Sequence, residues 1–293
     1  MMKDEALLLN KKARWKAIVF LASKWLLLLT LSVFFLFPIY AMLIRSFTPD
    51  AKLTDVRSLW LEEFYFGAYT KVFTAEYLGY LGNTLFVCIA NISGVCIASS
   101  LCAYGLSKVK FKGRDVVFMI IMATVLLPGT VTSIPLRIIY NKLNWTGTLY
   151  PLWVPIWFGG GAMNIFLVRQ FMKGIPNSYS EAALLDGANS LQIYWKIVLP
   201  LIKPIMVYLA VTGFFGCWND FSGPLMYVER EVSNWTLSLA LYQHFVKPQT
   251  TANNTLANTQ MAVGVLMMLP CVILFAFFQR ELMEGVAAIG IKG

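Results

Sequence analysis

Six long apolar stretches constrain this chain more than any other feature. An α-helix needs about 20 apolar residues to cross the roughly 30 Å hydrocarbon core of a bilayer. We expect membrane-spanning helices over about residues 17–44, 81–107, 115–140, 149–172, 197–219 and 259–280. Of the 293 residues, 58% are hydrophobic and only 13% are charged, a balance that excludes a soluble globule and a disordered chain. The sequence therefore predicts an all-α membrane protein with six transmembrane helices.

The basic residues predict how these helices are oriented. Fourteen Lys and Arg residues lie in the N-terminal segment 1–16, in the loops after the second and fourth helices and near the C-terminus, against eight in the opposite loops. Cytoplasmic loops are enriched in Lys and Arg, so we expect both termini in the cytoplasm. The same rule accounts for the net charge of +9. We therefore expect membrane lipid, and no nucleic acid, as a partner.

The helices lack the ionisable groups that many membrane functions need. No predicted helix carries a charge near its centre, which argues against an ion-coupled secondary carrier. His244 is the only histidine, the five cysteines lack metal-site spacing, and the sequence has no phosphate-binding loop. We expect no catalytic, cofactor or metal site in this chain, which disfavours a membrane enzyme or a metal-organised scaffold. If ATP drives the protein, another subunit hydrolyses it.

Neutral polar residues inside the helices are candidates for lining a solute pathway. Thr84 and Asn91 are seven residues apart and therefore share one face of a helix. Prolines and glycines interrupt several helices, as in helices that line a cavity, although kinking for packing is the alternative. The candidate pathway residues are Asn83, Thr84, Asn91, Asn164, Trp218, Asn219 and Asp220. Helix packing is the alternative role for the small polar residues, and anchoring at the membrane interface is the alternative for the Trp218 segment.

The loop over residues 173–196 is too polar to span a membrane and carries strong signals for helix ends. Ser178 and Glu181 have the spacing of a capping box, which predicts a helix start. Gly187 is expected to end that helix in the left-handed conformation. Asn189, with the glutamine three residues later, begins a second helix that runs to the next proline. Two short helices around a glycine turn favour docking into a groove of a partner protein.

The same loop carries a longer motif. Glu181-Ala182-Ala183, then Gly187, then Ile197-x-Leu199-Pro200 match the complete EAA motif, and on this motif the chain resembles the permease subunits of bacterial ABC importers. Further segments resemble the carbohydrate branch of that family, namely Asn83-Thr84-Leu85, Leu127-Pro128-Gly129, Trp218-Asn219-Asp220-Phe221 and Gly290-Ile291-Lys292-Gly293. The resemblance covers roughly residues 17–293 and points to the shorter permease of a maltose-type heterodimeric pair.

The resemblance implies a fold, a location and partners. It implies the six-helix fold of type I ABC importer permeases over residues 17–293, in the bacterial inner membrane, paired with a second, paralogous permease. Two ATPase subunits, which bind ATP and magnesium, and an extracytoplasmic solute-binding protein complete the expected assembly. The loop over 173–196 is then the coupling helix seated in the ATPase, with the contact residues Glu181, Ala182, Ala183, Asp186, Gly187, Ile197, Leu199 and Pro200. The tail over 281–293 reaches the ATPase through Gly290, Lys292 and Gly293.

The expected solute is a sugar or an oligosaccharide, because the candidate pathway is mostly neutral and polar and the motifs resemble the carbohydrate branch. Glycerol phosphate and an acidic oligosaccharide are alternatives, since the paired permease could supply the binding groups. We also expect the outer loop over about residues 228–258 to contact the solute-binding protein. Its aromatic residues Trp235, Tyr242 and Phe245 are of the type that anchors protein interfaces.

Overall fold

The computed structural model describes residues 2–49, 60, 63–247 and 257–290, with side chains from residue 15 to residue 283 within these ranges. The elements in this part of the chain are helices, and none is a strand. Two compact units are formed, the first from Met1–Lys71 with Asn253–Val265 and the second from Val72–Ala252 with Leu266–Gly293.

Several helices of the described chain are long and apolar enough to cross a membrane. Four do so as single stretches, namely Trp15–Ser46, Ala75–Ser107, Tyr150–Gly174 and Ala257–Met283. Two bent pairs meet the same criteria, namely Arg114–Leu126 with Gly129–Lys142 and Ser190–Leu201 with Lys203–Trp218. By length and composition, the described part of the chain thus contains four candidate spans, or up to six if each bent pair forms one span. The prediction of an all-α membrane protein is confirmed.

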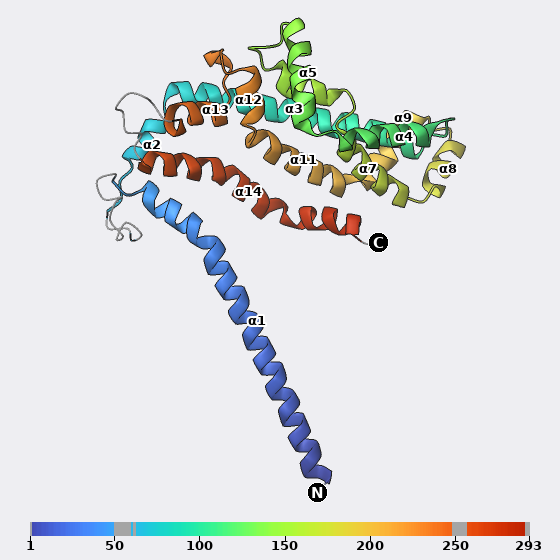
Figure 1. Cartoon of the computed structure of the whole chain (residues 1–293). Helices are drawn as coiled ribbons and strands as arrows, with labels where there is room; N and C mark the ends of the chain where they lie inside the picture. The colour runs from blue at the N-terminus through green and yellow to red at the C-terminus, as the bar shows by residue number, and fades with distance from the viewer. Residues whose placement is uncertain (1, 50–59, 61–62, 248–256, 291–293) are drawn as a thin grey trace. The chain divides into compact units, whose positions relative to one another are not determined.

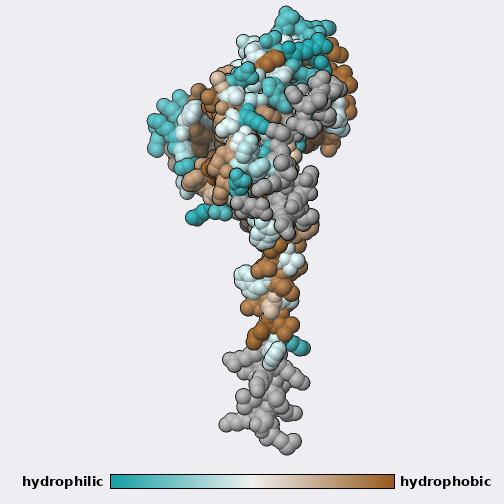
Figure 2. All heavy atoms as spheres, turned by 90° about the vertical axis from the view of Figure 1, so that its left-hand side faces the viewer, coloured by the Kyte–Doolittle hydropathy of each residue, from teal (hydrophilic) through white to brown (hydrophobic). Residues whose placement is uncertain are grey.

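The first unit is dominated by α1, a single helix over Met2–Ser46. The predicted N-terminal segment 1–16 and first spanning helix 17–44 are therefore continuous from Met2, because no glycine or proline interrupts their junction. Large apolar side chains such as Phe20 and Phe34 are exposed along α1, and Figure 2 shows the apolar surface on one of its faces. A helix with apolar residues on every side belongs in a hydrocarbon environment.

The second unit is built around α3, Ala75–Ser107. It packs against α7 and α11, which span Ala162–Gly174 and Lys203–Trp218. Small residues such as Ser99 and Ala103 are fully buried on α3, and such residues let membrane helices approach closely. Figure 1 shows α4, α8 and α9 toward the Ser107 end of α3, and α12 and α13 toward its other end.

A run of glycines brings the fourth predicted helix onto α3. The helix predicted over 149–172 consists of α6, η4 and α7, of which α6 spans Tyr150–Trp153 and η4 spans Pro155–Trp157. Gly159, Gly160 and Gly161 separate η4 from α7, and all three have positive φ angles. A Cβ atom on Gly160 would overlap the backbone nitrogen of Ser99 in α3. Only glycine therefore fits at this contact, which explains why the helix is interrupted here.

A proline divides the third predicted helix. The range 115–140 contains α4, η3 and α5, which span Arg114–Ala123, Thr124–Leu126 and Gly129–Lys142. The chain bends by 100° between η3 and α5. Leu127 is extended, with φ −79° and ψ 116°, because the ring of Pro128 disfavours the helical conformation of the residue before it. The range predicted as one interrupted span is therefore a bent pair of helices, with the break at Leu127-Pro128-Gly129.

The fifth predicted helix begins later than expected. Residues 190–201 form a separate helical stretch of α9, the π-helical turn η5 and α10, which span Ser190–Ile193, Tyr194–Val198 and Leu199–Leu201. This stretch meets α11 at Ile202 with a bend of 76°. Pro200 and Pro204 lack the N–H groups that a continuous helix needs across this junction. The apolar helix therefore starts at Lys203 and not at residue 197, and the second short helix of the loop runs one residue past Pro200.

The segment after α11 is more ordered than expected. It contains α12, η6, α13 and η7, which span Ser222–Tyr227, Val232–Asn234, Leu237–Leu241 and Tyr242–Val246. The Trp235 ring lies 6.1 Å from that of Tyr80 in α3, and the Phe245 ring stacks at 5.7 Å on Tyr77. These contacts hold the segment on α3. The Tyr242 ring lies 4.5 Å from that of Phe221, so all three predicted interface aromatics have partners within the chain.

The last helix, α14, spans Ala257–Gly290 and continues past the predicted end at residue 280. The predicted tail over 281–293 is therefore helical as far as Gly290, because it contains no proline to end the helix. Lys292 and Gly293 lie outside the described residues.

Candidate central cavity and docking surface

A central cavity of about 430 Å³ lies in the second unit where α3, η4, α7 and α11 meet. Its lining combines apolar side chains with hydroxyl, amide, thiol and carboxyl groups. The lining residues are Thr84, Val87, Asn91, Val95, Leu152, Ile156, Asn164, Leu209, Thr212, Gly213, Gly216, Cys217, Asp220, Pro224 and Thr236. Small-molecule sites are typically apolar cavities of roughly 300–1,000 Å³ with a few convergent polar groups, and this cavity has that character.

Backbone contacts orient the polar side chains of the cavity. The Asn91 amide Nδ2 donates to the carbonyl of Leu152 at 3.2 Å, and the Asn164 Nδ2 donates to that of Gly160 at 2.7 Å. Thr84 Oγ1 accepts a hydrogen bond from the backbone N–H of Leu237 at 2.8 Å. Two of these backbone partners lie at or beside the breaks around η4. The interruptions of the helices therefore position polar groups at the cavity.

Asp220 is the one charged residue among those that line the cavity, and none of them is basic. Its Oδ1 accepts a hydrogen bond from the backbone N–H of Gly223 at 3.0 Å. Burial raises the pKa of the Asp220 carboxyl, while hydrogen bonds from the amides of Gly223 and Ser222 lower it in part. An anionic solute would meet this carboxylate with no cation on the walls that this chain supplies.

The loop after α7 folds much as its sequence predicts, with one correction. The first helix, α8, spans Ser178–Leu185, but its N-cap is Asn177 and no side chain caps it. Ser178 lies inside the helix, so the predicted capping box of Ser178 and Glu181 is wrong. Gly187 has a φ of +81°, as predicted for a left-handed terminator. The predicted start of the second helix at Asn189 is confirmed, and the structure adds a capping box there, because Asn189 and the glutamine three residues later exchange two hydrogen bonds of 2.8 Å.

Apolar side chains are exposed on this loop. Tyr179, Leu184, Leu185, Leu191 and Trp195, which we call the docking surface, are between 54% and 90% exposed. Among the predicted contact residues, Glu181, Ala182, Asp186, Gly187 and Pro200 are exposed, Ile197 and Leu199 are half-buried, and Ala183 is buried. Contiguous exposed apolar residues mark protein or membrane contacts. The exposed carboxylates Glu181 and Asp186 beside these apolar residues favour a protein contact over a lipid contact.

The Ser107 end of α3 holds the loop. The Lys108 ammonium donates to the carbonyl of Ile175 at 2.6 Å and to Oδ1 of Asn177 at 3.2 Å, and burial lowers its pKa. The Tyr104 hydroxyl donates to the carbonyl of Ser190 at 3.0 Å. Both short helices are thus fastened to the helix that lines the central cavity.

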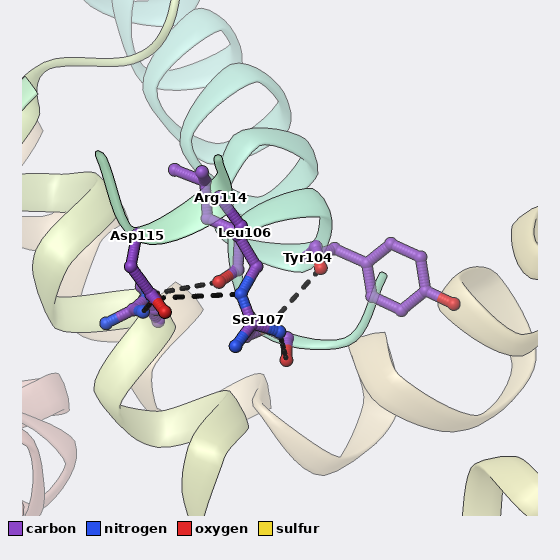
Figure 3. A network of polar contacts seen from close by, with 6 residues as sticks. Tyr104, Leu106, Ser107, Arg114 and Asp115 are labelled. Carbon is purple, nitrogen blue, oxygen red and sulfur yellow. Dashed lines mark hydrogen bonds and ion pairs between the residues drawn. The ribbon is translucent and has the colours of Figure 1, made fainter. Parts of the chain in front are cut away.

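An arginine joins three helices at the same end. Arg169 of α7 is 3% exposed. Its Nε donates to the carbonyl of Leu106 at 3.0 Å, and its Nη2 pairs with Asp115 of α4 at 3.0 Å. Its guanidinium also lies 3.8 Å from the centroid of the Phe118 ring. Figure 3 shows Arg114 and Asp115 beside the last turn of α3 in this network. The contacts fix the ends of α3, α4 and α7 to one another.

Comparison with known proteins identifies the family. The family described as "Binding-protein-dependent transport system inner membrane component" matches residues 94–286. The chain belongs to this family. The "Probable starch degradation products transport system permease protein AmyC" of Thermoanaerobacterium thermosulfurigenes is 30% identical to this permease, over 90% of this chain and 94% of its own. The arabinooligosaccharides permease AraQ of Halalkalibacterium halodurans is 28% identical over 88% and 91%.

Solved structures agree with the fold. This permease superimposes with a TM-score of 0.80 and 26% identity on a chain of a bacterial ABC transporter involved in the import of the acidic polysaccharide alginate. The match covers 89% of this chain and 96% of the other. The chain thus has the fold of an ABC importer permease, an inner-membrane component with several apolar helices, as expected from the EAA resemblance.

Four of the seven predicted pathway residues of this permease line the cavity, namely Thr84, Asn91, Asn164 and Asp220. The other three have structural contacts. Asn83 Nδ2 donates to the carbonyls of Ser233 and Trp235, Trp218 Nε1 donates to that of Met267, and Asn219 Nδ2 donates to that of Phe215. Each of these side chains is engaged by backbone outside the cavity.

Three polar lining residues were not among the predicted ones, namely Thr212, Cys217 and Thr236. Thr212 lies one turn before Gly216 on the same face of α11, and both residues line the cavity. Cys217 follows Gly213 with the same spacing. Thr236 comes from a segment folded back onto α3, and no local pattern predicts that.

Proposed function

We propose that this permease is the transmembrane subunit of an ATP-driven importer of a neutral sugar or oligosaccharide. The observation that carries the proposal is the central cavity, whose polar groups are hydroxyls, amides and one carboxylate without a basic residue. Such groups form hydrogen bonds with sugar hydroxyls, and the surrounding apolar residues can pack against the faces of a sugar ring. The names of the relatives, which refer to starch degradation products and arabinooligosaccharides, support this class of solute.

An acidic oligosaccharide is the second candidate. The similarity to the alginate transporter favours it, since the two chains share one fold over most of their lengths. The cavity argues against it, because the Asp220 carboxylate would repel an anionic solute in a site of low dielectric constant. We rank the neutral solute first for that reason.

The docking surface supports a role in coupling. We propose that α8 and the turn at Gly187 seat in an ATPase subunit, with Glu181, Ala182, Asp186 and Pro200 in contact and Ala183, Ile197 and Leu199 supporting the segment from beneath. ATP and magnesium then belong to two ATPase subunits. The exposed apolar side chains and the bonds from Tyr104 and Lys108 to this segment support the proposal.

The remaining partners follow from the family. Its description implies a solute-binding protein, which we place at the α12 and α13 end of the second unit. We propose that both termini and the docking surface lie in the cytoplasm, and the excess of Lys and Arg in those segments supports this orientation. We further propose a second, paralogous permease that closes the open side of the cavity, and a contact of the C-terminal residues Gly290, Lys292 and Gly293 with the ATPase.

The test is transport by the assembled importer in proteoliposomes. ATP-dependent uptake of neutral arabino- or malto-oligosaccharides is expected, and uptake of uronic acid oligosaccharides is not. Asn91→Ala should raise the KM for the neutral solute about tenfold, the effect of one lost hydrogen bond of about 1.4 kcal/mol. Asn219→Ala removes the same side chain outside the cavity and should not. Uptake of only the acidic solutes would favour the second candidate.

A further inference from the structure

One short helix borders two cavities. Pro224 of α12 lines the central cavity. The residues that follow it, Leu225 to Tyr227, line a second cavity of about 840 Å³. Polar residues of α5, such as Arg137 and Asn141, form another part of the second cavity. Four of the six residues of α12 therefore line one or the other of these two spaces.

Different kinds of contact hold the two ends of α12. At its C-terminal end, the carbonyl of Tyr227 accepts a hydrogen bond from the backbone N–H of Gly147 at 2.7 Å, and its ring lies 5.3 Å from that of Tyr140. At its N-terminal end, Asp220 Oδ1 accepts from the backbone N–H of Gly223 at 3.0 Å. The Asp220 carbonyl accepts from the Ser238 hydroxyl at 2.6 Å. The N-terminal end thus depends on a carboxylate that also lines the central cavity.

The fit around this carboxylate is close. A Cβ atom on Gly223 would lie 2.5 Å from Asp220 Oδ2 and 3.1 Å from Leu152 Cδ2. The start of α12 therefore packs directly against the carboxylate and the cavity wall. The buried carboxylate is stabilised by donors, which here are the backbone amides of α12. A solute hydroxyl in the central cavity is a donor of the same kind and would compete with them.

We infer that Asp220 is the positioning residue that holds α12 as a wall between the two cavities and releases it when a hydroxylated solute occupies the central cavity. The release depends on the proposed function, since it requires a solute with hydroxyl groups. The holding of α12 by Asp220 depends only on the contacts above.

The native thiol of Cys217 can report on this wall, because it lines the central cavity. The other four cysteines, namely Cys88, Cys96, Cys102 and Cys271, are replaced by alanine in the full importer with its partner subunits. A membrane-impermeant maleimide is then added from the side of α12, and the rate of Cys217 labelling is measured in the absence of solute and ATP. Only variants that assemble with wild-type yield are compared.

Asp220→Ala should raise the labelling rate at least about tenfold, because the amides of α12 lose their acceptor. Gly223→Ala should raise it as well, since its Cβ atom displaces the carboxylate. Asp220→Asn keeps an acceptor oxygen and should stay within about twofold of the parent. Ser222→Ala changes only an exposed hydroxyl of α12 and is the matched control. Unchanged rates in both Asp220→Ala and Gly223→Ala would overturn the inference.

ATP hydrolysis tests the release step. Asp220→Ala should hydrolyse ATP without solute at the rate that the parent reaches only with saturating oligosaccharide. A residue that merely contacts the solute would instead raise the solute concentration for half-maximal stimulation, and that result alone would overturn the release step. If no saccharide is transported while the labelling rates change as expected, the proposed function is contradicted, and the proposal that Asp220 holds α12 is still supported.

Discussion

Arg169 and Asp115 show how unequal the two partners of an ion pair can be. The Arg169 side chain is 4% exposed, whereas that of Asp115 is 70% exposed. The arginine also donates to the carbonyl of Leu106 and lies over the Phe118 ring, so it makes contacts that the aspartate does not share. An exposed ion pair contributes little on its own, and the arginine therefore stabilises this end mainly through its buried contacts.

Arg169→Met should lower the stability of the permease by about 1–3 kcal/mol, because a buried carbonyl loses its donor and the ring loses its cation. Asp115→Asn should cost less than about 1 kcal/mol, because its carboxylate is mostly in solvent. Thermal unfolding of both purified variants in detergent measures the difference. Equal losses would show that the ion pair itself dominates.

Gly187→Ala should weaken docking without preventing membrane insertion. A side chain at the φ of +81° costs roughly 1–2 kcal/mol, and a Cβ atom there meets nothing within 4 Å. The cost is therefore strain in the turn alone, which redirects α9 relative to α8. Gly174→Ala, also with open space around its Cβ position and no positive φ, is the control. Co-purification of the ATPase should fall only in Gly187→Ala, and equal recovery from both would contradict the coupling role.

At the scale of elements, α3 connects the two functional regions of the second unit. Thr84 and Asn91 line the cavity in its first half, and Tyr104, with Lys108 just after it, binds the loop at its other end. The helix is unbroken over Ala75–Ser107, unlike the segments packed on it. An unbroken helix between bent ones is suited to carry movement of the docking surface to the cavity.

Gly160→Ala tests the contact that presses η4 and α7 onto α3. The new methyl group would overlap the α3 backbone at Ser99. The alanine would also have to adopt the backbone φ of +77° that Gly160 has. We expect a loss of about 2–4 kcal/mol from overpacking and backbone strain together. Gly105→Ala, on the same helix α3 with nothing within 4 Å, should be neutral or slightly stabilising. Thermal unfolding separates the two, and a neutral Gly160→Ala would mean that α7 can shift freely on α3.

At the scale of the whole molecule, the permease is one component of a multi-subunit transport system. Its described surface leaves large apolar residues exposed on α1 and on the docking surface. Lipid is the expected environment of the first, and the ATPase is the partner proposed for the second.

Deletion of residues 290–293 should lower solute-stimulated ATP hydrolysis by more than it lowers the yield of assembled importer. The reason is that these residues are proposed to contact the ATPase and not to stabilise the permease. A variant with the same four residues replaced by serine keeps the length of the chain, so it distinguishes a need for these side chains from a need for a tail of this length. Wild-type stimulated hydrolysis after the deletion would rule out a coupling role for the C-terminus.

Features that depend only on residues close together in the sequence could be predicted from the sequence of this protein. A membrane-spanning helix satisfies its own backbone within one stretch of apolar residues, so the spans could be predicted from composition alone. The turn at Gly187 and the helix start at Asn189 are equally local, and both formed as predicted. The capping box at Ser178 did not, because Asn177 one residue earlier took the N-cap position.

Tertiary contacts alone decided which polar residues line the cavity. Asn83 and Thr84 are neighbours, yet successive residues of a helix point about 100° apart, so Thr84 lines the cavity while Asn83 binds the segment at Ser233. Asp220 lines the cavity and Asn219 beside it does not, because the chain leaves the helix α11 at Trp218 and the Asn219 side chain turns back to the carbonyl of Phe215. The Arg169 network and the packing of Gly160 on Ser99 join segments more than fifty residues apart. Such partners are chosen when helices pack, and no spacing along the chain encodes them.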